Sequence, residues 1–116
     1  MNVAFRKVAP ALVAGNCAIL KPSEIAGLTC MFIGKLAKDA GIPPGVLNIV
    51  TGGRDTGAAL ANSPLISMIS FTGSSLTGTK IMEACAPKLS QVALELGGKS
   101  ALVLSLIHIS EPTRPY

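Results

Sequence analysis

Short apolar runs alternate along this chain with longer segments of helical periodicity. Four of the runs are typical of buried strands: 17–20, 46–50, 66–71 and 92–96. The segments with helical character surround them: 5–14, 22–40, 56–61 and 74–86. Strands that are joined through helices pair in parallel, and helices then cover both faces of the sheet. The pattern therefore predicts an α/β fold with a parallel sheet and flanking helices, to which residues 100–104 would add a fifth strand.

The helix expected after the first strand has one clear apolar face. Its start is predicted at Pro22, because Ser23 and Glu24 suit the free amides and positive dipole of a first turn, and its end at Gly41. Apolar residues then follow at steps of three and four: Ile25, Leu28, Phe32 and Leu36. This spacing predicts that these four side chains face the core.

The composition excludes several classes of protein. The chain is 49% hydrophobic and 14% charged, which is too apolar for a disordered protein. No stretch reaches the roughly 20 uninterrupted apolar residues that a membrane-spanning helix needs. Ten Lys and Arg residues outnumber six Asp and Glu, but they are spread along the chain rather than clustered with aromatic residues. We therefore expect neither a membrane nor a nucleic acid as a partner.

The cysteines form no recognisable metal or disulfide pattern. Cys17, Cys30 and Cys85 are odd in number and widely spaced, and the single His108 cannot hold a metal ion alone. Each cysteine is expected to be a small buried hydrophobe. The N-terminal apolar stretch is interrupted by Pro10, unlike a signal peptide, so a cytoplasmic location is expected.

Ligands of parallel sheets bind beyond the carboxyl ends of the strands, which makes the residues there candidate site residues. After the first strand, Glu24 could accept hydrogen bonds from both hydroxyls of a ribose, and Lys21 could donate to the same diol. After the third strand, Gly73 would let the backbone approach a phosphate, to which Ser74 and the amides of the next helix could donate. The alternatives are an ordinary helix start at Lys21 and an ordinary capped turn at Ser74.

Glu95 lies between two leucines and enters a double-glycine bend. A buried carboxylate is costly unless it is paired or used, so this position is a candidate for a general base. The alternative is an ion pair between Glu95 and Lys99 at the turn.

Taken together and in order, five segments of the chain resemble the aldehyde dehydrogenase superfamily. They are Val8–Leu12 with Ala14–Asn16, Lys21–Glu24, Gly41–Asn48, Phe71–Ser74 and Glu95–Lys99. The resemblance implies a partial Rossmann-like parallel sheet with flanking helices, a fragment of an aldehyde dehydrogenase fold.

The resemblance also implies a cofactor and the residues that bind it. The cofactor is NAD rather than NADP, because Glu24 would crowd and repel a 2′-phosphate. The cofactor-binding residues carried over are Lys21, Ser23, Glu24, Gly53, Phe71, Gly73 and Ser74. By the same resemblance Glu95 is the catalytic base that activates water for hydrolysis of a thioester, which points to a carboxylic acid product.

The domain organisation follows from the same comparison. Residues 1–98 would be a partial dinucleotide-binding domain and residues 99–104 the start of the catalytic domain. Residues 105–116 resemble nothing in the family and look like a translated sequencing adapter. The nucleophilic cysteine of the family lies further along than this sequence extends, so none of the three cysteines takes that role.

Three functional hypotheses remain open at this point. The first is a fragment of an NAD-dependent aldehyde dehydrogenase, inactive alone, whose intact relatives act on small aldehydes and form homodimers or homotetramers. The alternative is a non-catalytic dinucleotide-binding module. The third is a polypeptide that does not fold by itself.

Overall fold

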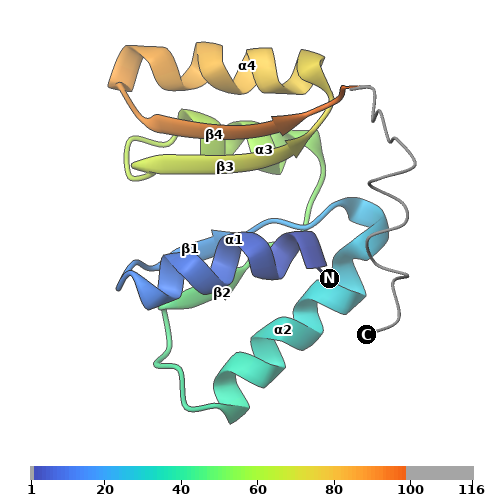
Figure 1. Ribbon diagram of the computed structural model, residues 1–116, viewed down its shortest axis with the longest axis vertical. Helices are drawn as coiled ribbons and strands as arrows, with labels where there is room; N and C mark the ends of the chain where they lie inside the picture. Colours follow the sequence, from blue (N-terminus) through green and yellow to red (C-terminus); the bar gives the residue numbers. More distant parts are fainter. Residues whose placement is uncertain (1, 99–116) are drawn as a thin grey trace, which may run out of the picture.

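The computed structural model describes residues 2–98, which form helices and parallel strands in alternation (Figure 1). The elements in chain order are α1 (Asn2–Val13), β1 (Ala18–Leu20), the 3-10 turn η1 (Glu24–Ala26), α2 (Gly27–Asp39), β2 (Leu47–Ile49), α3 (Arg54–Asn62), β3 (Met68–Gly73), α4 (Ser75–Cys85), the 3-10 turn η2 (Ala86–Lys88) and β4 (Gln91–Leu96). The α/β class and the four strands predicted within this range are confirmed. The strand expected over 100–104 lies outside the described residues.

The strands form two parallel ladders of two strands each. β1 pairs with β2, with Leu20 opposite Ile49, and β3 pairs with β4, with Phe71 opposite Leu94. Within residues 2–98 no ladder joins β1 to β3, although both ladders run in the same direction (Figure 1). The parallel pairing follows from the helical crossovers, α2 within the first ladder and α4 within the second.

In the first ladder both helices contribute to one small core. Ala4 from α1 joins Cys30 and Ile33 from α2, and these three pack against the strand residues Leu20, Leu47 and Ile49. The neighbouring strand residues Ile19 and Asn48 are exposed, because their side chains point to the opposite face. Within the described chain this ladder is therefore covered on one face, whereas the sequence predicted cover on both.

In the second ladder α4 lies on the strands. The missing side chain of Gly78 lets α4 lie close to Leu96. A Cβ at position 78 would be only 2.8 Å from the leucine side chain. Cys85, at the end of α4, is 1% exposed, and α3 packs beside α4 with Ala61 buried. The opposite face of this ladder is exposed and carries polar side chains, including Ser70 and Thr72.

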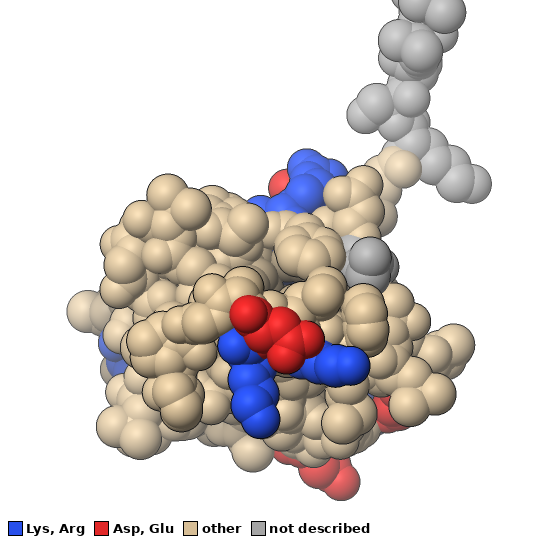
Figure 2. Space-filling view, turned by 90° about the horizontal axis from the view of Figure 1, so that it is seen from below, with Lys and Arg blue, Asp and Glu red and all other residues tan. Residues whose placement is uncertain are grey.

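The apolar face predicted for α2 is not the buried one. Ile25 is 100% exposed and Leu28 87%, whereas Ile33 is 3% exposed. Phe32 and Leu36 are also exposed. α2 carries apolar residues on two sides, and the ladder contacts the side that holds Cys30, Ile33 and the small residue Gly34. Figure 2, which views the molecule from below, shows a group of charged side chains near the centre of that face, surrounded mainly by uncharged residues.

The start of α2 also differs from the prediction. The chain first makes the 3-10 turn η1, closed by a 3.0 Å hydrogen bond from the Ala26 amide to the Ser23 carbonyl. Ser23 precedes η1, and its hydroxyl caps neither η1 nor α2. The cysteine prediction is correct for Cys30 and Cys85 but wrong for Cys17, which is exposed just before β1.

Candidate functional site

The predicted site residues from all four strands lie toward the same edge of the molecule. Lys21 and Glu24 follow β1, Gly53 follows β2, and Ser74 follows β3. Glu95 is the second-last residue of β4. Because both ladders run in the same direction, these residues share the carboxyl edge (Figure 1). The parallel topology thus brings candidate site residues from distant parts of the sequence to one edge of the molecule.

The residues predicted to bind ribose come together at the start of α3. The Glu24 carboxylate lies so close to Gly53 that a Cβ there would be 2.7 Å from Oε1. The aliphatic part of Lys21 lies one turn further along α3, where a Cβ on Gly57 would be 3.8 Å from Cδ of the lysine. Lys21 Nζ donates to the carbonyl of Pro22 at 3.2 Å. A carboxylate and an ammonium therefore stand beside the same helix terminus, one able to accept hydrogen bonds and one able to donate them.

Ser74 occupies the N-terminus of α4, as predicted. Its Oγ accepts a hydrogen bond from the Thr77 amide at 3.3 Å and lies 3.0 Å from Thr77 Oγ1. This satisfies one of the free amides of the first turn. The Phe71 ring lies directly over Gly73, where a Cβ would overlap it. Phe71, Gly73 and Ser74 thus lie close to one another at the end of β3.

Glu95 is exposed, which contradicts its predicted burial between two leucines. It lies opposite Thr72 in the ladder, on the face of the sheet away from α4. Consecutive side chains of a strand point to opposite faces, so the flanking leucines do not enclose the carboxylate. The alternative partner of Glu95, Lys99, lies outside the described residues.

One polar contact near this face was not predicted. Lys7 Nζ, on α1, donates to Ser70 Oγ at 2.8 Å. Ser70 lies two residues before Thr72 on β3, so the lysine reaches the same sheet face as Glu95. The two residues are separated by 63 positions in the sequence, and nothing in the local pattern around Lys7 indicates this contact.

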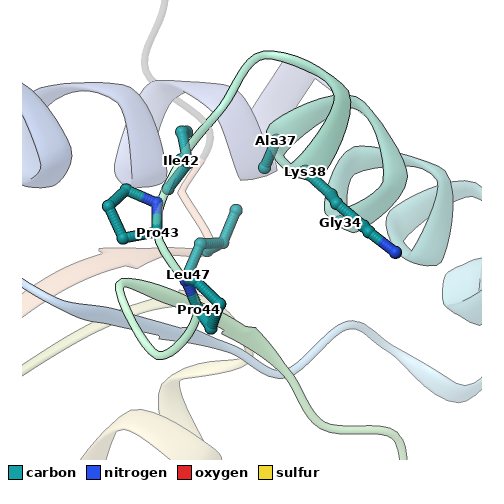
Figure 3. A pocket seen from close by; sticks show the side chains of 7 residues that line it. All are labelled: Gly34, Ala37, Lys38, Ile42, Pro43, Pro44 and Leu47. Carbon is teal, nitrogen blue, oxygen red and sulfur yellow. The ribbon is translucent and has the colours of Figure 1, made fainter.

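The hollow in Figure 3 belongs to the opposite edge of the first ladder. It encloses about 200 Å³ between the end of α2, the turn that precedes β2 and the first residue of β2. Its apolar lining comes from Ile42, Pro43, Pro44 and Leu47, while Lys38 extends away from the two prolines (Figure 3). This hollow holds none of the predicted site residues.

Residues 2–98 show neither a cluster of metal ligands nor a helix suited to a bilayer. No group of three or more His, Cys, Asp and Glu side chains in this range is placed to hold a metal ion. The helices of the same range lack the combined length and hydropathy that crossing a bilayer requires.

Comparison with known sequences identifies close relatives. The model of the aldehyde dehydrogenase family matches residues 1–106. The chain is 58% identical over 105 residues to the peroxisomal aminoaldehyde dehydrogenase 2 of Pisum sativum, covering 90% of this chain and 21% of the relative. It is 54% identical over 99 residues to the chloroplastic betaine aldehyde dehydrogenase of Beta vulgaris, covering 84% and 20%. The chain thus spans about a fifth of the length of these relatives.

Solved structures agree with this match. The γ-glutamyl-γ-aminobutyraldehyde dehydrogenase of Burkholderia cenocepacia superposes with a TM-score of 0.82 and 46% identity, over 84% of this chain and 20% of that one. A complex of PnpE with nicotinamide adenine dinucleotide gives 0.79 and 46%, over 82% and 20%. An NADP-dependent enzyme of E. coli gives 0.78 and 44%, over 80% and 20%.

These comparisons correct one expectation and establish another. The predicted cytoplasmic location is wrong, because the plant relatives named above are peroxisomal or chloroplastic. Cysteine usage reports the redox state of a compartment, which does not distinguish the cytosol from these organelles. The family match extends over most of the sequence and the fold match over most of the described residues. The chain belongs to the aldehyde dehydrogenase family.

Proposed function

We propose that this chain supplies the NAD-binding part of an enzyme that oxidises an aldehyde to a carboxylic acid. The observation that carries the proposal is the meeting of Lys21 and Glu24 with Gly53 and Gly57 at the carboxyl edge. The first two residues follow β1 and the glycines follow β2, so only a folded ladder brings them together. Dinucleotides bind at this place in open parallel sheets.

The donor set fits the ribose of a dinucleotide. A ribose diol offers two hydroxyl groups. The Glu24 carboxylate can accept hydrogen bonds from both hydroxyls, and the Lys21 ammonium can donate to their oxygens. A 2′-phosphate at this position would be repelled by the Glu24 carboxylate, which favours NAD over NADP. Related structures include both an NAD complex and an NADP-dependent enzyme. Family membership therefore does not predict which dinucleotide is bound, and the preference for NAD is proposed from the residues at this site.

The second part of the site fits a phosphate. The free amides at the start of α4 favour an anion, as does the helix dipole. Ser74 Oγ accepts from the Thr77 amide, and when Thr77 Oγ1 donates to it as well, the Ser74 proton is free for a phosphate oxygen. Phe71, packed over Gly73, would lie against the bound cofactor.

In the proposed reaction NAD, when bound, accepts a hydride from the substrate. Glu95 would take a proton from the water that hydrolyses the acyl thioester, and its exposure leaves the carboxylate accessible to that water. None of the cysteines in the described chain suits the nucleophile. Cys30 and Cys85 are 5% and 1% exposed, and Cys17 lies before β1, at the edge away from Lys21 and Glu24. We therefore place the nucleophile outside these three residues.

The substrate class is proposed from the relatives. Aminoaldehyde and betaine aldehyde dehydrogenases of plants share 50–58% identity with this chain. This favours an aldehyde that carries an amino or quaternary ammonium group. The proposal concerns the whole enzyme, of which the chain spans about a fifth.

Calorimetric titration of the 116-residue chain with NAD tests the cofactor proposal. We expect saturable binding, weakened about 10- to 100-fold by Glu24→Ala or Lys21→Ala, because each change removes a charge-assisted hydrogen bond of about 1.5–3 kcal/mol. Asp39→Ala, at the far end of α2, is the control and should leave the dissociation constant unchanged. Absence of binding at millimolar NAD would contradict the proposal, as would unchanged affinity in both site variants.

The second candidate, a dinucleotide-binding module without catalysis, is favoured by the positions of the three cysteines. An assay of aldehyde-dependent NADH fluorescence separates the two functions for the chain as it stands. NAD binding without NADH production is expected, since no nucleophilic thiol lies at the described site. NADH production that Cys17→Ser abolishes would contradict this placement of the nucleophile.

A further inference from the structure

Gly53 does not have the positive φ that usually calls for glycine. Its backbone dihedrals are φ −85° and ψ −148°, outside the left-handed region that disfavours a side chain. The preceding Gly52 is different, with φ +146° and with Thr56 occupying the space of a Cβ. Positive φ therefore favours glycine at position 52, whereas at position 53 the neighbouring side chain has to be considered.

The space left by Gly53 is used by the Glu24 carboxylate. A Cβ at position 53 would lie 2.7 Å from Oε1 and 3.8 Å from Cδ of Glu24, and no other atom comes within 4 Å of it. The first distance is shorter than a van der Waals contact, so one group would have to move. Glu24 is exposed and its carboxylate is the end of a flexible side chain, so the carboxylate would move.

The location of the carboxylate follows from the start of α3. Gly53 is the N-cap of α3, and no side chain of its own caps the helix. A carboxylate beside a helix N-terminus is stabilised by the dipole and the free amides. On the same helix, Gly57 leaves room for the Lys21 stem. Each glycine thus leaves the space that one of the two charged side chains occupies.

We infer that Gly53 is a specificity-determining position, because it leaves the space in which the Glu24 carboxylate can accept from the ribose hydroxyls and repel a 2′-phosphate. Gly53 is a positioning residue, because it acts through Glu24 and not by its own contact with the cofactor. The inference rests on the proposed NAD-binding function and adds to it the reason why this carboxylate discriminates. A side chain at position 53 would displace the carboxylate and weaken the discrimination.

The test compares Gly53→Ala with Gly27→Ala in the 116-residue chain. Gly27 has helical dihedrals, φ −55° and ψ −53°, and a Cβ there would make an ordinary 4.0 Å contact with Thr51, so this matched variant adds the same methyl group without touching Glu24 or Lys21. Dissociation constants for NAD and NADP are measured by calorimetry. Gly53→Ala should weaken NAD binding about tenfold, which is comparable to the loss of one hydrogen bond. It should also bring the ratio of the dissociation constants for NADP and NAD toward one. Gly27→Ala should leave this ratio unchanged.

A double-variant cycle shows whether the effect passes through Glu24. In a Glu24→Ala background, Gly53→Ala should have no further effect on the ratio, because no carboxylate remains to be displaced. An equal effect in both backgrounds overturns the inference, as does an unchanged ratio in Gly53→Ala. Gly53→Ala should fold, as judged by circular dichroism, because the exposed Glu24 carboxylate can move away from the added methyl group. A Gly53→Ala variant that does not fold would show that the backbone itself requires glycine, and overturns the inference too.

The inference and the proposed function fail in different ways. If the wild-type chain binds neither dinucleotide, the result contradicts both the proposed function and the inference. If the wild-type chain binds NAD and the Gly53→Ala variant discriminates between NAD and NADP as well as the wild type does, the result contradicts the inference alone.

Discussion

Two serines at the ends of strands look alike in the sequence and behave differently in the structure. Ser23 and Ser74 both follow a strand and stand at the N-cap of a helical turn. Only Ser74 uses its hydroxyl, accepting from the Thr77 amide. The difference arises because α4 begins directly after Ser74, whereas a 3-10 turn separates Ser23 from α2.

The two serines therefore differ in their predicted contribution to stability. Ser74→Ala should lower the free energy of unfolding by about 1 kcal/mol, the usual contribution of a capping hydroxyl. Ser23→Ala is the matched control and should change it by a few tenths of a kcal/mol at most. Urea denaturation followed by circular dichroism measures both. Equal losses in the two variants would contradict the assignment of the cap to Ser74.

Leu89 is the one non-glycine residue with positive φ within residues 2–98, and its side chain is 90% exposed. An L side chain in this conformation is strained, and asparagine tolerates it better. Leu89→Asn should therefore raise the free energy of unfolding by about 1 kcal/mol, which is part of the roughly 1–2 kcal/mol cost of the left-handed conformation. Leu65→Asn removes a leucine of similar exposure, 88%, at a residue without positive φ, and should have little effect. A loss of stability in Leu89→Asn would show that this leucine makes an unrecognised contact.

At the scale of elements, the strands were easier to predict than the orientation of the helices. A run such as 92–96 is short, apolar and flanked by turn residues, so its strand character is local. α2 is apolar on two sides, and periodicity alone cannot say which side faces a sheet. The contact with Ile49, made possible by Gly34, selected the side with Cys30 and Ile33.

This orientation of α2 gives a prediction about two apolar residues of one helix. Ile33→Ala should lower the free energy of unfolding by about 2–4 kcal/mol, because it removes buried methyl groups and leaves a cavity. Leu28→Ala should change it by less than about 0.5 kcal/mol, because the side chain is 87% exposed. Chemical denaturation of both variants measures the difference. The reverse ranking would show that the face predicted from the sequence is the buried one.

At the scale of the whole molecule, the arrangement of the strands leaves unpaired backbone. Each of the four strands has one partner within the described chain, so each has one free edge. Free edges offer amides and carbonyls to other chains and favour association. Three large apolar residues add exposed apolar surface: Ile25 of η1, and Leu28 and Met31 of α2.

We predict concentration-dependent self-association of the 116-residue chain through a strand edge. Sedimentation velocity should show a sedimentation coefficient that rises with concentration. Ile19→Lys should reduce this rise, because a charged side chain on an edge strand disfavours pairing. Val13→Lys adds the same charge at the end of α1, outside the ladders, and serves as the control. A single species at all concentrations would contradict the prediction, and so would an equal effect of the two lysines.

The sequence by itself determined the α/β class, the strand positions and the residues at the strand ends, because short apolar runs, turn glycines and helix breaks act locally. It also indicated the family, through five motifs in order. It did not determine that Glu95 is exposed, that Lys7 reaches Ser70, or that α2 packs through Ile33. Those depend on distances between segments far apart in the chain, which are set only when the ladders form. The same holds for the space at Gly53, whose neighbour Glu24 lies 29 positions earlier in the printed sequence.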